Sequence, residues 1–408
     1  MNYYEPQCHR PLPIRLSQIS SRLRRIVLNT PLLWTNLDDK VFRSSAILDC
    51  FLQRSQNCGL EIDIRDVSES MVYVKKVLRN FDKVVVCVNR WHSLYLQIDF
   101  QSNLDMFIAR VHDLCAPNLN LISIIFAPIR NFLDEALATT IFTGGTPALK
   151  SLRLTGVACF PNSLETLTSL YLCTYPWLFP LLLYSRFREQ LIAMRSLVHL
   201  RCVGPITHCP SMEAIKAVNL PSLRSLTIKV LMDREAPPRR HFVSRLCYTL
   251  PTTTLQHISL TALTDQMVLS FVHYMRNGTL RFPHVKSLTW SSKLTDEKDI
   301  ITIMESFAEV EDLTIPSNFT DTSESLLQVL LQHDRDSPTK CLLWPHLHTL
   351  RLKLPWRIIL LHDFVVIRLA TDSPIRKVWT FDSILAETKE VKWLQEYAGL
   401  ESLQCDWD

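Results

Sequence analysis

The sequence predicts an α/β solenoid, in which short parallel strands line the concave side and helices line the convex side. Three observations support this fold class. The chain has 408 residues, which is more than one compact hydrophobic core usually holds. Its apolar fraction of 47% is enough for a large buried core. One short apolar pattern also recurs along most of the chain, which is typical of stacked repeats.

The recurring pattern is apolar-x-x-apolar-x-apolar, usually after a proline or a short polar break. Its closing alternation points two side chains to one face of a short strand, and the opening apolar residue packs beneath the strand entrance. One such strand cannot bury its face alone, whereas stacked parallel neighbours can. The copies begin at Trp91, Leu119, Leu149, Leu167, Leu197, Leu223, Leu255, Val285, Val310, Leu347, Ile375 and Leu400.

Segments with the spacing of amphipathic helices lie between these strands. In one of them, Glu324 follows Asp321 by three residues, as in a capping box. Strands that alternate with helices at this period predict a parallel sheet with helices on one side. We expect helices over 131–142, 211–218, 264–275, 299–307, 321–332 and 384–397.

The pattern resembles leucine-rich repeats in a degenerate form. Successive copies begin 18 to 37 residues apart, and most copies lack the Asn or Cys that these repeats carry a few residues after the strand. We therefore expect a leucine-rich-repeat-like solenoid over residues 41–408. Its register and the number of regular repeats stay open at this point.

The composition argues against several classes of enzyme. Glycine is scarce, with 7 residues in the whole chain, and phosphate-binding loops need glycine because their backbone approaches the ligand closely. Neither glycine-rich nucleotide motif occurs, and G-x-S-x-G and H-E-x-x-H are also absent from the sequence. The net charge of +4 is too small to indicate nucleic-acid binding. We expect a non-catalytic protein without a cofactor or a metal.

The cysteines predict a reducing compartment. Twelve of them are scattered without a C-x-x-C motif, and Met1–Pro13 contains no signal-peptide core. We therefore expect reduced thiols in the cytoplasm or the nucleus. No apolar run approaches the ~20 residues of a membrane helix, so we expect no membrane association. The densest His/Cys group is interpreted as structural, since Cys202 occupies an inward strand position; its other members are His199, His208 and Cys209.

Residues 12–40 form a distinct helical segment after an expected flexible N-terminus at 1–11. Apolar residues at helical spacing predict one helix that reaches Val27, with Arg22, Arg24 and Arg25 near its polar side. Pro31 ends this helix, because proline disfavours the helical conformation of the preceding residue. Residues 32–34 then form a compact apolar knot.

The run LSQISSRLRRIVLNTPLLWTNL, over residues 16–37, resembles the second half of the F-box-like motif in F-box/leucine-rich-repeat proteins of the expanded fungal type. The stretches RSQNCGLEIDI (54–64) and RWHSLYLQI (90–98) are similar to the same set. The resemblance implies a substrate receptor of a cullin–RING ubiquitin ligase. Its F-box would bind a Skp-type adaptor, and its solenoid would select the protein to be ubiquitinated. The positions that match the motif are Leu16, Ile19, Ile26, Pro31, Leu32 and Trp34.

The resemblance is incomplete at its N-terminal side. Residues 1–11 do not supply the first F-box helix, which normally opens on a Leu-Pro-x-Glu type of sequence, and Leu23 stands where the family usually has tryptophan. The chain is therefore either a truncated product or one that has lost adaptor binding, or residues 14–37 only cap the open end of the solenoid. The alternative function is an interaction scaffold without coupling to a ubiquitin ligase.

The outward strand positions form the candidate partner-binding face, since they alternate with the inward ones. They include six Lys or Arg residues and one acidic residue, and aromatic and Arg side chains dominate binding hot spots. We hypothesise an acidic or phosphorylated partner protein; a generic solvated sheet face is the alternative. The candidate residues are Tyr95, Arg153, Tyr171, Arg201, Lys229, Arg351, Lys353 and Trp379.

Overall fold

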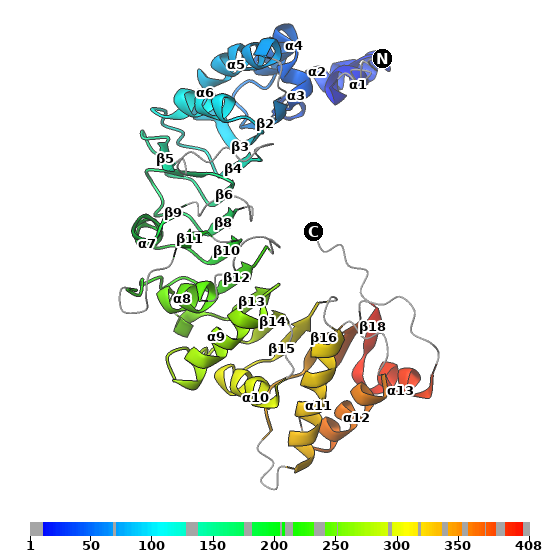
Figure 1. The fold of residues 1–408 in the computed structure, drawn as a ribbon. Helices are drawn as coiled ribbons and strands as arrows, with labels where there is room; N and C mark the ends of the chain where they lie inside the picture. The colour runs from blue at the N-terminus through cyan, green and yellow to red at the C-terminus, as the bar shows by residue number, and fades with distance from the viewer. Residues whose placement is uncertain are drawn as a thin grey trace, which may run out of the picture. The chain divides into compact units, whose positions relative to one another are not determined.

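The computed structural model describes residues 11–67, 71–127, 138–174, 182–204, 206–208, 215–231, 241–250, 252–292, 296–316, 320–336, 342–352, 358–371, 373–380 and 388–402. The protein is an α/β structure built on parallel strands, which agrees with the predicted solenoid-like class (Figure 1). It divides into two compact units, residues 1–197 and 198–408. This boundary falls inside the segment that the sequence predicts as one solenoid.

The first unit carries parallel strands that are hydrogen-bonded in chain order. Helices α3 (Asp39–Phe42), α4 (Ser45–Arg54), α5 (Met71–Val85) and α6 (Gln101–Val111) connect the early strands, and α7 (Tyr184–Ala193) follows the last one. A separate parallel pair is formed by β5 (Ala138–Ile141) and β7 (Ala158–Pro161). The strands of the main sheet are β1 (Asn36–Leu37), β2 (Leu60–Val67), β3 (Trp91–Ile98), β4 (Leu121–Phe126), β6 (Ser151–Thr155) and β8 (Ser169–Cys173).

The second unit repeats this parallel order with a more regular helical layer. Each helix of the layer contacts the next one along the chain, and Figure 1 shows them on one side of the strands. The helices are α8 (Phe242–Thr249), α9 (Asp265–Arg276), α10 (Glu297–Ser306), α11 (Thr320–Asp336), α12 (Ile358–Ala370) and α13 (Lys389–Ala398). The strands are β10 (His199–Val203), β12 (Ser225–Lys229), β13 (His257–Thr261), β14 (Ser287–Ser291), β15 (Asp312–Ile315), β16 (Thr349–Leu352), β17 (Lys377–Thr380) and β18 (Leu400–Ser402).

The predicted apolar pattern forms the core of both units. In the eleven copies from Trp91 to Thr380, every residue at the three pattern positions has at most 2% of its surface exposed. Burial of one such Leu or Ile side chain stabilises the fold by about 1.5–3 kcal/mol. The twelfth copy begins at Leu400, which is buried, while its two later positions lie outside the described residues.

Most strand entrances share one backbone geometry. The carbonyl just before one strand accepts two consecutive N–H groups of the next strand, as the Lys150 carbonyl does from Thr168 and Ser169. In the second unit, the carbonyls of Val198, Arg224, Gln256, Lys286, Glu311 and His348 do the same.

A buried apolar residue also lies three positions before the pattern in most copies, and its carbonyl accepts the N–H of the opening residue. Examples are Leu164, Leu220, Phe282, Phe307 and Trp344. The local geometry that these copies share therefore begins one turn earlier than the sequence pattern indicates.

Three predicted helices are confirmed as α9, α10 and α11, and α13 occupies the described part of 384–397. The helix predicted over 131–142 is wrong at its end, because residues 138–141 form β5, where Thr139, Thr140 and Ile141 are β-branched. Residues 131–137 lie outside the described residues.

The helix predicted over 211–218 is also wrong in its described part, residues 215–218. The N–H of Val218 donates to the Thr249 carbonyl at 2.8 Å and so is not available for a helical bond.

The single helix predicted before Pro31 is two helices, α1 (Leu12–Ser17) and α2 (Ser21–Leu28). Ser20 separates them because its extended backbone and its Oγ, which accepts the Leu23 N–H at 3.2 Å, make it the N-cap of α2.

Gly144 lies where two backbone segments approach closely. A Cβ atom at this position would be 2.9 Å from the backbone nitrogen of Cys115 and 3.0 Å from the carbonyl carbon of Leu114. Because backbone atoms cannot rotate away, we expect Gly144→Ala to lower the free energy of unfolding by about 1–3 kcal/mol. Urea denaturation followed by circular dichroism measures this change. Gly59→Ala is the control, since its Cβ would make an ordinary contact of 3.4 Å with His92 Cβ; equal losses for both variants would contradict the prediction.

Candidate protein-binding surfaces

The face of the first unit that alternates with the buried pattern brings three predicted residues into one row. Tyr95 pairs with Ser123, Ser123 with Arg153, and Arg153 with Tyr171 across β3, β4, β6 and β8. Arg153 is exposed and both tyrosines are half-buried, whereas Ser123 is buried. This row offers one cation between two aromatic side chains, which is a suitable composition for contact with a protein.

Acidic and basic groups meet at one end of this row. Asp63 pairs in register with Tyr95, and its carboxylate lies 2.8 Å from the Arg65 guanidinium. The hydrogen bond from Arg65 to Asp63 raises the pKa of Arg65 further. Because Asp63 is paired with Arg65, Arg153 is the group of the row that can recognise an anion.

The second unit aligns three further predicted residues. Arg201 of β10 begins a row that reaches Arg351 of β16 and Trp379 of β17. Arg201 and Lys229 are exposed, and Arg351 and Trp379 are half-buried. Lys353 lies outside the described residues. The positions between the two arginines are Thr227, Ser259, Thr289 and Thr314.

The candidate binding residues chosen from the sequence do not include these hydroxyl residues, although a signal exists. Each one lies between two buried apolar residues of its strand, as Thr289 does between Leu288 and Trp290. Four adjacent strands carry Ser or Thr at this position. Only the registered pairing shows that the four side chains are neighbours.

The N-terminal segment separates its predicted residues into two groups. Ile19, Ile26 and Leu32 have 67%, 49% and 71% of their surface exposed, which is unusual for large apolar side chains. Leu16 and Pro31 are half-buried. Trp34, at the end of the 3-10 helix η1 (Pro31–Trp34), is buried in the core of the first unit. Its ring therefore cannot contact a partner directly.

Trp34 is held by three contacts. Its Nε1 donates to the Val27 carbonyl at 2.9 Å, its ring meets Phe51 edge-on at 5.1 Å, and the Arg54 guanidinium lies 5.4 Å from the ring centroid. These contacts join α2 to α4 through one side chain.

Trp91 repeats the main feature of this arrangement. Its Nε1 donates at 3.0 Å to the carbonyl of Val84, seven residues earlier in the chain. Trp34 likewise donates to a carbonyl seven residues earlier, that of Val27. Both tryptophans come shortly after the end of an α-helix and next to a short 3-10 helix: Trp34 is the last residue of η1, and Trp91 follows η2 (Val88–Arg90). Strand β1 then pairs with β2 as the later strands pair with their neighbours. Residues 21–37 therefore share the local geometry of the helix–strand unit at 71–98.

Arg90 connects the other two stretches on which the family resemblance rests. Its guanidinium donates to Ser55 Oγ at 2.6 Å and to the Cys58 carbonyl at 3.1 Å. The C-terminal end of α4 is thus tied to the entrance of β3. This accounts structurally for the arginine that precedes Trp91.

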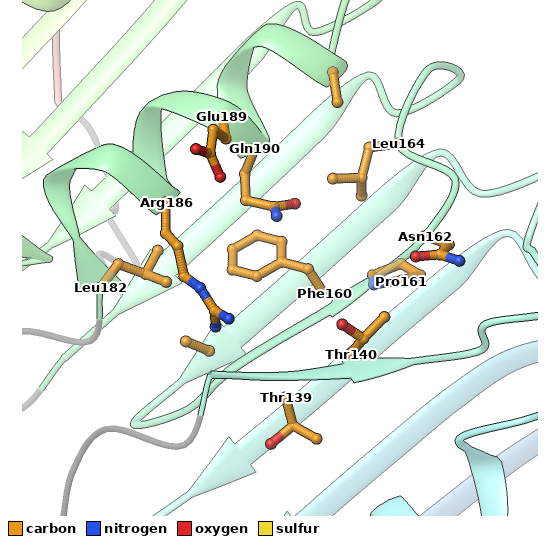
Figure 2. Close-up of a pocket in the computed structure, with 12 residues that line it drawn as sticks. Thr139, Thr140, Phe160, Pro161, Asn162, Leu164, Leu182, Arg186, Glu189 and Gln190 are labelled. Carbon is orange, nitrogen blue, oxygen red and sulfur yellow. The ribbon is translucent and has the colours of Figure 1, made fainter.

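A hollow of about 280 Å³ opens on the helix side of the first unit, between the β5–β7 pair and α7. Figure 2 shows Phe160 at its centre, with Arg186, Glu189 and Gln190 projecting from the helix around it. Its lining includes no histidine and no cysteine. None of the residues predicted from the sequence lines the hollow.

The described part of the chain offers little for a metal, a reactive thiol or a membrane. Within the described ranges, no group of three or more His, Cys, Asp or Glu side chains could hold a metal ion. Cys202 is buried while His199 on the same strand is exposed; the side chain of His208 and all of Cys209 lie outside the described residues. Burial raises the pKa of the Cys159 thiol to about 12, which makes it a poor nucleophile. No described helix has the length and apolar character to cross a bilayer.

Comparison of the chain with known protein families and with curated proteins finds no match.

Variants of Trp34 and Leu32 distinguish residues that support the fold from residues that form an interface within the same motif. We expect Trp34→Ala to lower the free energy of unfolding by about 3–5 kcal/mol, because it leaves a cavity and removes the bond to Val27. Leu32→Asp changes an exposed side chain and should alter that free energy by no more than about 0.5 kcal/mol. Chemical denaturation of both variants measures the difference. Similar losses in the two variants would show that the exposed residues also support the fold.

Proposed function

We propose that this chain is a non-catalytic substrate receptor of the F-box/leucine-rich-repeat type, acting in the cytoplasm or nucleus. Its sheet face would bind a target protein, and its N-terminal helices would bind a Skp-type adaptor of a cullin–RING ligase. The observation that carries the proposal is the alignment of Arg, Tyr and Trp side chains in rows on parallel sheets. Those rows hold Tyr95, Arg153 and Tyr171 in the first unit and Arg201, Arg351 and Trp379 in the second.

The chemistry of these rows favours a target that is acidic or phosphorylated. Arginine forms bidentate, charge-assisted hydrogen bonds with carboxylates and phosphates. The strands that carry the arginines are fixed by buried neighbours on both sides in sequence, such as Leu152 and Leu154 around Arg153. A rigid backbone lowers the entropy lost on binding.

Adaptor binding draws support from the exposed apolar residues of the N-terminal segment. Ile19, Ile26 and Leu32 leave much of their apolar surface exposed, which a partner could bury, and exposed apolar surface of this kind marks interaction sites. Trp34 and Val27 face the core at the same time. The segment can therefore cover the core at the N-terminal end of the first unit and still present a docking surface.

A scaffold without ubiquitin-ligase coupling is the second candidate. Its support is the equivalence of Trp34 with Trp91, which gives residues 21–37 a purely structural role as the first helix–strand unit. The two candidates share the target-binding face and differ only in the adaptor.

Co-purification with a Skp-type adaptor separates the two candidates. We expect the unmodified chain to retain the adaptor, and Ile26→Asp/Leu32→Asp to lose it at least tenfold while the fold persists. Leu183→Asp is the matched control, because Leu183 is 72% exposed in the first unit, away from the N-terminal segment. A chain that retains no adaptor in any form would favour the scaffold.

Charge reversal tests the target-binding face. We expect Arg153→Glu/Arg201→Glu to lose acidic or phosphorylated proteins that the unmodified chain captures from lysate, as quantified by mass spectrometry. Phosphatase treatment of the lysate should remove the phosphorylated subset. Lys75→Glu/Lys298→Glu is the control, since it makes the same change in net charge at exposed positions on α5 and α10. An unchanged set of captured proteins after reversal of the two arginines would refute this assignment.

A further inference from the structure

The second unit contains a row of small hydroxyl side chains, which we call the hydroxyl row: Thr227, Ser259, Thr289 and Thr314. One residue comes from each of β12, β13, β14 and β15, and each is paired directly with the next. The first three keep part of their surface exposed, and Thr314 is buried. Short side chains of this kind leave room for a bound backbone, and a hydroxyl both donates and accepts hydrogen bonds.

Cationic side chains stand at both ends of the hydroxyl row. Arg201 pairs with Thr227 at one end, where Lys229 lies two residues further along β12. Arg351 pairs with Thr314 at the other end, and Lys377 follows on β17. Arg201, Lys229 and Lys377 are exposed, and Arg351 is half-buried. Five strand-to-strand steps of roughly 4.8 Å separate β10 from β16, which places the two ends about 24 Å apart.

The other charged groups on this face restrict where an anion can bind. Asp312 lies two residues before Thr314 and pairs in register with Ser287 and Thr349. Asp312 is on the strand next to that of Arg351, so its carboxylate partly offsets the positive charge at this end of the row. Glu401, beyond Trp379, opposes negative charge past the far end. His199 and His257 lie one row away near the first end. Negative charge on a ligand is therefore favoured by the cations at the two ends, whereas the uncharged hydroxyl row between them offers it no cation.

We propose that the second unit binds an extended segment of a partner protein with two anionic groups and a neutral stretch between them. The segment lies across the strands, over the hydroxyl row, with one anion at Arg201 and Lys229 and the other at Arg351 and Lys377. An extended chain rises about 3.3 Å per residue, so a span of about 24 Å corresponds to about seven residues. This inference rests on the proposed target-binding function and specifies the spacing of charge in the target.

Fluorescence anisotropy of the full chain with labelled peptides tests the spacing. The peptides have a neutral Gly-Ser-Ala frame that carries two phosphoserines seven residues apart, two phosphoserines three apart, one phosphoserine, or two aspartates seven apart. We expect the peptide with seven-residue spacing to bind at least fivefold more tightly than the other phosphoserine peptides. The aspartate peptide shows whether the site requires phosphate or accepts any anion. Tight or weak binding of this peptide is compatible with the proposal, provided that the phosphoserine peptides show the preference for seven-residue spacing.

Variants test whether the peptide binds at the two cationic ends and over the hydroxyl row. Lys229→Glu/Arg351→Glu should weaken the best peptide at least tenfold. Lys298→Glu/Lys389→Glu, at exposed positions on α10 and α13, should leave the affinity unchanged. Thr289→Val keeps the shape of the side chain and removes its hydroxyl, so we expect a loss of about threefold.

Three results would overturn the proposal. These are no peptide binding, affinity that does not depend on spacing, and equal competition by a single-stranded RNA of the same charge, which would indicate a diffuse electrostatic surface. Ile26→Asp/Leu32→Asp should bind the peptides like the unmodified chain. Peptide binding without adaptor retention would leave this inference intact and refute the ubiquitin-ligase role, whereas protein capture without peptide binding would refute only the inference.

Discussion

The in-register pairing of short parallel strands is the constraint on which the rest of the structure depends. At most entrances, one carbonyl accepts two consecutive N–H groups at the start of the following strand, and in most copies a buried apolar residue closes the turn before it. This geometry fixes the register, and a slip of one residue would exchange the buried and outward faces. It therefore determines both the core and the order of the outward side chains. Arg201, Thr227 and Ser259 are neighbours for the same reason that Leu200, Leu226 and Ile258 are.

The N-terminal segment shows how one short motif can serve the core and a surface together. Trp34 donates to the Val27 carbonyl and packs on Phe51, so its indole contributes to the interior. Ile26, adjacent to Val27 in sequence, turns to the other side of α2 and remains exposed. A motif match based on residue type alone does not distinguish these two uses. The burial of each side chain does.

The second unit also contains a polar interaction that departs from its apolar core. Arg368 and Asp334 form an ion pair at 2.7 Å between α12 and α11, with no exposed surface on either side chain. Arg368 also donates to the Trp344 carbonyl at 2.9 Å, which ties both helices to the turn before β16. Burial lowers the pKa of Arg368 and raises the pKa of Asp334, while their mutual attraction acts in the opposite direction on each group. Loss of one partner would leave a buried charge unpaired, which is strongly destabilising.

The sequence by itself determined the α/β class, the parallel strands and the side chains that fill the core, because local periodicity reports which face a residue occupies. It also located helices α9 to α11 and the outward positions of Arg153, Arg201 and Arg351. Only the tertiary structure decided the division into two units, the burial of Trp34 and the strand β5 at 138–141. It also decided that four hydroxyl side chains separate Arg201 from Arg351. These features depend on hydrogen bonds and packing between residues distant in sequence, such as Val218 with Thr249, and a local pattern carries no information about such partners.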